Sequence, residues 1–119
     1  MPSLTMDGPF RFDEQTISNL FTGNEIGNFA LGFINENKMF VVCRVEKATK
    51  NLKNDLMSFL GRNEKYKFFK YKFALNVKEA YELECKNFHD FGGDSGLLDN
   101  KDHPVSPEGT VLFCPYCSK

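Results

Sequence analysis

The clearest pattern of apolar and polar positions lies over residues 76–91. Apolar side chains recur there at three- and four-residue spacing, the period of one face of an α-helix, at Val77, Ala80, Tyr81, Phe88 and Phe91. Asn76 can accept hydrogen bonds from the first free amide groups, and Glu79 follows three places later in a capping-box arrangement. Gly92 and Gly93 supply a stop. We therefore predict a helix that begins near Val77 and ends before these two glycines.

One acidic residue, Glu84, interrupts the apolar face of this helix. A carboxylate taken from water into an apolar environment needs a cation, several hydrogen-bond donors or a metal ion, or it becomes protonated. Glu84 is therefore a candidate functional residue. The alternative is that it is paired with a buried lysine or arginine and has no chemical role.

The rest of the chain predicts a small sheet flanked by helices. Two strand-like runs, residues 28–34 and 39–45, flank a polar turn and should form an antiparallel hairpin. Helical spacing indicates a helix over residues 51–60 and a shorter one over residues 14–21 that packs on the sheet as a lid. A third strand over residues 65–73 alternates lysine with aromatic residues and slips phase once, which predicts a bulge.

These elements define an α+β fold with a three-stranded antiparallel sheet in one domain over residues 1–119. Residues 1–25 form a helical extension, and residues 92–119, which have little periodicity, form a wrapped tail of loops. Neither a membrane-spanning apolar run nor a secretory signal is present, so we expect a cytoplasmic protein without a membrane partner. In a reducing compartment the four cysteines are thiols or metal ligands, and Cys43, in a strand, is a small core residue.

Charge is concentrated in the middle of the chain. Residues 44–72 contain nine basic and three acidic residues, a net charge of +6 that leaves −7 for the rest of a chain whose formal net charge is −1. Such a basic band can follow a phosphate backbone, and its aromatic residues can stack on bases. Outward lysines and inward aromatic residues on a strand serve burial and solubility alone, and this is the commoner arrangement.

The tail carries a candidate metal site. Cys114 and Cys117 form a CxxC pair, which presents two thiolates to one tetrahedral ion. Cys85 and His89, one turn apart on the predicted helix, offer two more ligands, and His103 competes with His89 as the nitrogen ligand. We therefore predict a structural Zn²⁺ site of three sulfurs and one nitrogen that clamps the tail to the helix. Unliganded, partly buried thiols are the alternative.

Several motifs together resemble a bacterial and phage branch of uncharacterised GIY-YIG-like proteins, which is similar to the GIY-YIG nucleases. The resemblance covers nearly the whole chain and is most specific in its C-terminal half. The matching segments are Gly-Asn-Phe-Ala-Leu-Gly-Phe at 27–33, Glu-Cys at 84–85, Phe-His-Asp-Phe-Gly-Gly at 88–93, Leu-Asp-Asn at 98–100, His-Pro at 103–104 and Cys-Pro-Tyr-Cys at 114–117.

The resemblance implies a set of catalytic roles, most of which this chain has lost. The metal-binding glutamate of the family corresponds to Glu84. The first family tyrosine falls on Phe29, the second on Arg44 with its glycine on Glu46, and the helix arginine on Asp55. Without two phenols and a guanidinium, little charge stabilisation remains for phosphoryl transfer. The resemblance therefore implies a catalytically inactive relative in which Glu84 is vestigial.

Three functions follow from the sequence. The first is a non-catalytic module that binds nucleic acid or a protein partner. The second is an active nuclease that uses Mg²⁺ or Mn²⁺ on Glu84. The third is a zinc-stabilised protein with an unrelated interaction surface. Asn100 is a candidate ligand contact, although capping a turn is its more common role. The complete set of candidate binding residues is Phe29, Arg44, Lys47, Lys65, Lys67 and Asn100.

Overall fold

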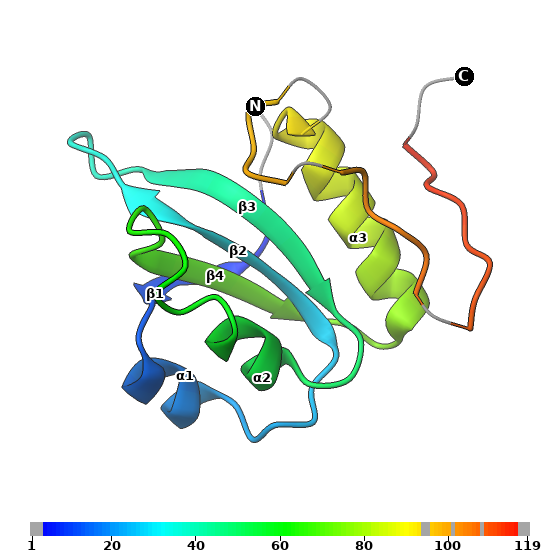
Figure 1. The fold of residues 1–119 in the computed structure, drawn as a ribbon, viewed down its shortest axis with the longest axis horizontal. Coiled ribbons are helices and arrows are strands. Elements are labelled where there is room, and N and C mark those ends of the chain that lie inside the picture. Colours follow the sequence, from blue (N-terminus) through cyan, green and yellow to red (C-terminus); the bar gives the residue numbers. More distant parts are fainter. Residues whose placement is uncertain (1–3, 94–95, 101, 108, 117–119) are drawn as a thin grey trace.

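Four antiparallel strands form one sheet at the centre of the computed structural model, which describes residues 4–93, 96–100, 102–107 and 109–116 (Figure 1). The strands are β1 (Asp7–Arg11), β2 (Gly27–Ile34), β3 (Phe40–Ala48) and β4 (Phe68–Phe73), and their order across the sheet is β1-β4-β2-β3. The predicted hairpin of β2 and β3 and the third strand, β4, are present. The expectation of three strands is wrong, because β1 adds a fourth.

The additional strand β1 also corrects the prediction that residues 1–25 are only a helical extension. Its sequence, Asp-Gly-Pro-Phe-Arg, lacks alternating apolar residues, and it pairs with a single neighbour, β4, at the edge of the sheet. Proline has no N–H to donate, and it is tolerated at sheet edges and at irregularities such as the register shift between Asp7 and Phe10. The predicted short helix follows as α1 (Glu14–Leu20), capped by Asp13, whose side chain accepts from the Thr16 amide.

Helices cover both faces of the sheet (Figure 1). On one face, α1 and α2 (Leu52–Met57) enclose a core that contains Phe29 and Leu31 of β2. On the other face, α3 (Val77–Asp90) packs on β2 and β3, where Ala30 of β2 lies in a second core. The alternation of β2 residues between the two cores follows the two-residue period of a strand. Helix α2 ends three residues before the predicted Leu60, and turns connect it to β4.

Helix α3 confirms the prediction from its spacing. The Asn76 side chain accepts from the Glu79 amide at 2.8 Å, and the helix ends at Asp90. The Glu79 carboxylate reaches back one residue further than in a capping box and accepts from the Leu75 amide at 2.8 Å. Gly92 then adopts a φ of +79°, a conformation that favours glycine.

The predicted bulge in residues 65–73 is not found. Strand β4 begins at Phe68, and its register with β2 is continuous; the irregularities lie between β2 and β3, at Leu31 and Gly32, and on β1 in its pairing with β4, between Asp7 and Phe10. Phe69 is fully buried, as expected for an inward aromatic residue, whereas Phe73 is half exposed.

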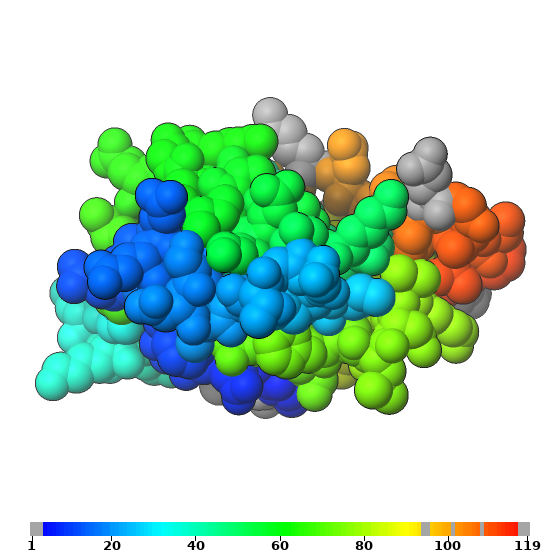
Figure 2. All heavy atoms as spheres, turned by 90° about the horizontal axis from the view of Figure 1, so that it is seen from below, coloured from blue at the N-terminus to red at the C-terminus, as the bar shows by residue number. Residues whose placement is uncertain are grey.

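The tail runs along α3 and the outer edge of β3. In Figure 2 it lies beside α3 and away from α1. Asp99 donates its backbone N–H to the Cys43 carbonyl oxygen, so the tail pairs with the free edge of β3. None of the helices in the described residues combines the length and apolar character that crossing a membrane would require.

Candidate functional site

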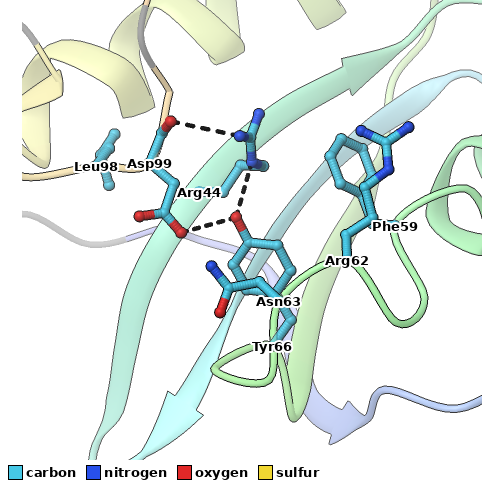
Figure 3. Close-up of a pocket in the computed structure, with 7 residues that line it drawn as sticks. All are labelled: Arg44, Phe59, Arg62, Asn63, Tyr66, Leu98 and Asp99. Carbon is cyan, nitrogen blue, oxygen red and sulfur yellow. Dashed lines mark hydrogen bonds between the residues drawn. The ribbon is translucent and has the colours of Figure 1, made fainter.

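A hollow of about 460 Å³ lies where β3, the segment after α2 and the tail meet (Figure 3). Arg44 enters it from β3, Phe59, Arg62 and Tyr66 enter it from the α2–β4 connection, and Asp99 enters it from the tail. Three segments far apart in the sequence therefore build one wall of polar and aromatic side chains.

A hydrogen-bond network fixes the polar groups of this hollow. The Tyr66 hydroxyl donates to Asp99 Oδ2 at 2.8 Å and accepts from Arg44 Nε at 2.9 Å. Arg44 Nη1 lies 2.7 Å from Glu46 Oε2, and Lys65 Nζ lies 3.2 Å from Asp99 Oδ1. Burial raises the pKa of Tyr66, and donation to Asp99 raises it further against the opposing effect of Arg44, so the phenol stays protonated at neutral pH. The charges of Arg44 and Lys65 are thus balanced by carboxylates.

Two guanidinium groups approach the ring of Phe59. The Cζ of Arg44 lies 5.1 Å from the ring centroid and the Cζ of Arg62 lies 5.0 Å from it, both within cation–π range. Unlike Arg44, Arg62 forms no ion pair with any residue of the described part of the chain. Arg62 is exposed, so it presents an uncompensated positive charge at the hollow.

A second hollow of about 410 Å³ contains Glu84, and Arg44 lines both hollows. Glu84 is only 4% exposed, which confirms that it faces the interior, and its Oε1 lies 2.8 Å from Lys47 Nζ. Burial raises the pKa of Glu84 to about 7, against the opposing effect of Lys47. The structure therefore shows the buried-lysine alternative, in which the ammonium group of Lys47 lies beside Glu84.

A third hollow of about 700 Å³ shares Asn63 and Tyr66 with the first and includes exposed Lys67. We call the three hollows together the β3 groove. Arg44 lines both the hollow of Glu84 and the central one, and Tyr66 lines both the central one and that of Lys67. Their mixture of aromatic and charged side chains suits an extended ligand.

The prediction that Phe29 is a binding residue is wrong. It is 1% exposed and belongs to the core under α1 and α2, where its ring centroid lies 5.9 Å from that of Phe59. A ligand in the groove therefore has no access to its side chain. Asp55, the position of the family arginine in the resemblance, lies on α2 and lines none of the three hollows.

Asn100 is used by the protein itself. Its Oδ1 accepts from the Val45 amide at 3.0 Å, and its Nδ2 donates to the Val45 carbonyl oxygen at 2.7 Å. The side-chain amide thus replaces a neighbouring strand at the edge of β3. This is a capping role, at a strand edge rather than a turn, and it leaves little of the amide for a ligand.

The structure brings together three of the predicted metal ligands. The thiol sulfurs of Cys85 and Cys114 and a ring nitrogen of His103 all lie within 4.8 Å of one another, so this group can hold a metal ion. His89 contacts the group through its Nε2, 3.2 Å from Nε2 of His103. Cys117 lies outside the described residues. Cys43 is a buried core residue, as expected.

Without a cation the Cys85 thiol disfavours ionisation. Burial raises the pKa of Cys85 to about 12, and the hydrogen bond to the neighbouring Cys114 thiol raises it as well. A bound metal ion would reverse this preference, because a coordinated thiol loses its proton.

Sequence reasoning missed Phe59, Arg62, Tyr66 and Asp99 as members of the site. Tyr66 belongs to the alternating lysine and aromatic run, but that pattern does not show that its hydroxyl faces Arg44. Asp99 belongs to the Leu-Asp-Asn motif, but only Asn100 of that motif was predicted to contact a ligand. Arg62 follows Gly61 in a turn, where the sequence offers no periodic signal.

No protein-family model, curated protein or solved structure matches the chain. What the structure establishes is an α+β fold with a four-stranded antiparallel sheet flanked by helices, and a group of cysteine and histidine side chains that can hold a metal ion. The resemblance to GIY-YIG proteins stays a prediction from the motifs in the sequence.

Proposed function

We propose that this chain is a non-catalytic GIY-YIG-like module that binds single-stranded nucleic acid in the β3 groove. The observation that carries the proposal is the arrangement of Arg44 and Arg62 around the ring of Phe59, with Arg62 free of any ion pair in the described residues. Single strands are bound by cationic grooves with aromatic side chains on which bases stack. Arg62 would contact a phosphate or stack on a base beside Phe59.

The feature that favours this ligand over a protein partner is a pair of exposed cations, because the lining of the three hollows as a whole carries five basic and six acidic side chains. Arg44 and Lys65 are held by carboxylates and act as fixed parts of the wall, whereas Arg62 and Lys67 are exposed and unpaired within the described residues. Two exposed cations separated by a wall of aromatic and hydrogen-bonding groups suit phosphates of an extended chain. Release of counterions from such a ligand makes its affinity fall steeply with salt.

The same geometry supports an inactive nuclease site. Phe29 has no hydroxyl and is buried, so it supplies neither a nucleophile activator nor a ligand contact. The carboxylate of Glu84 is neutralised by Lys47, and binding of Mg²⁺ or Mn²⁺ there would have to displace that ammonium group. We therefore expect binding without cleavage.

For the tail we propose a structural zinc ion. Soft thiolate and imidazole ligands in a tetrahedral set are typical of Zn²⁺, and Cys85, Cys114 and His103 supply two sulfurs and one nitrogen. The predicted set also contained Cys117 and His89. Because the ligands come from α3 and from the tail, the ion would hold residues 98–100 in place along β3, including the Asp99 side chain of the groove.

Binding is tested by fluorescence anisotropy with labelled single strands of DNA and RNA and the matching duplexes, over a range of salt concentrations. We expect salt-sensitive binding of single strands, which Arg62→Gln weakens about 5- to 30-fold through loss of a stacking or cation–π contact. Lys78→Gln removes the same charge from the exposed side of α3 and should change affinity less than about twofold.

Two results would contradict the proposal. The first is an absence of binding, or equal effects of the two substitutions. The second is strand cleavage in Mg²⁺ or Mn²⁺ that disappears in Glu84→Gln, which would establish an active nuclease instead.

A further inference from the structure

We infer that His89 and His103 bind the same metal ion, so that the centre has two nitrogen and two sulfur ligands: Cys85 and His89 from α3, His103 and Cys114 from the tail. The inference rests on the proposed metal clamp and changes its ligand set, because the sequence predicted one histidine and three cysteines.

The orientation of the His103 ring is set by a backbone carbonyl group. Its Nδ1 lies 2.7 Å from the carbonyl oxygen of Pro104. A carbonyl oxygen only accepts hydrogen bonds, so Nδ1 carries the hydrogen, and in the neutral ring Nε2 is left with a lone pair. Histidine metal ligands commonly have this arrangement, in which one ring nitrogen donates to a carbonyl group and the other faces the ion.

A nitrogen of the second ring, Nε2 of His89, lies close to the Nε2 lone pair of His103. Nε2 of His89 lies 3.2 Å from Nε2 of His103, and the two rings are tilted by 60° at a centroid separation of 5.2 Å. Two imidazole nitrogens bonded to one tetrahedral zinc at about 2.0–2.1 Å are about 3.3 Å apart. The observed separation therefore equals, within 0.1–0.2 Å, the distance that shared coordination requires.

The two sulfur ligands lie beside the His103 ring. The sulfurs of Cys85 and Cys114 and a ring nitrogen of His103 are all within 4.8 Å of one another, whereas His89 lies outside this group and reaches it through its contact with His103. Thiolates at about 2.3 Å from a tetrahedral zinc are about 3.8 Å apart, so the two sulfurs would move together by up to about 1 Å, and the His89 ring would turn toward them, when the ion binds. The burial of the four side chains is compatible with metal binding, because Cys85 is fully buried and Cys114 and both histidines are half-buried.

The position of the four side chains explains how such a centre forms. Cys85 and His89 are four residues apart on α3 and so project from the same face. The His103 ring packs edge-on against Phe88 at a centroid distance of 5.4 Å, which holds it over that face. Two ligands therefore come from a preformed helix, and the two tail ligands complete the centre when the tail docks.

X-ray absorption at the zinc edge of the purified full-length protein distinguishes the ligand sets. We expect a first shell of two nitrogen and two sulfur scatterers. A shell of one nitrogen and three sulfurs would overturn the inference while leaving a zinc clamp in place. Wild-type protein that takes up no zinc would instead remove the clamp itself.

Substitution gives a second and independent test. We expect His89→Asn and His103→Asn each to lower zinc affinity more than about tenfold, measured by competition with a chromophoric chelator. Asp90→Asn, which changes the neighbouring helical residue without removing a ligand, is the control and should bind zinc as the wild type does. If either histidine variant keeps wild-type affinity, that histidine is not a ligand and the inference is wrong.

Discussion

The side chain of Asn100 is predicted to stabilise the fold by closing the edge of β3 rather than by contacting a ligand. Asn100→Ala removes an acceptor 3.0 Å from the Val45 amide and a donor 2.7 Å from the Val45 carbonyl oxygen. Asn100 is 9% exposed and Val45 is fully buried, so water has little access to the groups left behind. The change therefore leaves two buried backbone groups without partners.

The expected magnitude follows from the cost of those groups. An unsatisfied buried donor or acceptor costs about 1–3 kcal/mol, and partial access of water to the truncated site reduces the sum, so we expect a loss of about 2–4 kcal/mol in the free energy of unfolding. Asn100→Asp keeps the acceptor but turns an oxygen toward the Val45 carbonyl group and toward Glu46, whose Oε2 lies 3.3 Å from the present Nδ2. It should destabilise the protein at least as much as the alanine variant.

Urea denaturation followed by circular dichroism measures these differences. Asn37→Ala, in the exposed hairpin turn, is a matched control and should shift the free energy by less than about 0.5 kcal/mol. If Asn100→Ala is equally mild, or if the aspartate variant is as stable as the wild type, the side-chain amide does not close the strand edge as described.

Three further perturbations follow from the structure. Lys47→Met removes the cation that lowers the pKa of Glu84, so this pKa should rise above its present value of about 7. The variant should lose about 2–4 kcal/mol of unfolding free energy at pH 8 and less at pH 5, where the carboxyl group is protonated. Equal losses at the two pH values, measured by chemical denaturation, would contradict this prediction. Gly32→Ala would place a Cβ 1.8 Å from a backbone carbonyl oxygen of β3 and should prevent folding or lower the melting temperature sharply, whereas a normal thermal melt would refute the close approach. Burial raises the pKa of Glu25, but hydrogen bonds from the Thr22–Gly23 turn outweigh this effect and lower the pKa to about 2. Because most of these hydrogen bonds are exposed to water, Glu25→Gln should cost less than about 1 kcal/mol of unfolding free energy at pH 7. That difference should vanish as the pH falls from about 4.5 toward 2, since a depressed carboxyl pKa contributes stability only while the group is ionised, and a difference that persists at pH 2 would have another cause.

Local signals made the helices and the central hairpin predictable. Asn76 and Glu79 mark the start of α3, and the apolar spacing places Glu84 on its inner face, as observed. In the same way the polar turn after β2 identifies the hairpin. Each of these features depends on residues a few positions apart, so the sequence contains the necessary information.

The features that were missed depend on contacts between distant residues. Lys47 is 37 residues from Glu84, and the chain holds many lysines with the same local pattern. Asn100 pairs with a strand 55 residues earlier, and its sequence context is that of an ordinary turn. Strand β1 forms because β4 offers it an edge, although its own residues have weak strand preference.

The order in which the partners of the sheet are made has a consequence for biosynthesis. Strand β4 receives its outer partner from residues 7–11, which are synthesised before the other three strands, whereas the edge of β3 is covered by Asp99 and Asn100, which are synthesised after all four. The nascent chain therefore passes through a stage in which the hairpin is complete but one row of amide and carbonyl groups is open. Such an edge templates association between chains. Truncation before residue 98 would make that transient stage permanent, and the shortened protein should accumulate as aggregates where the full chain stays dispersed.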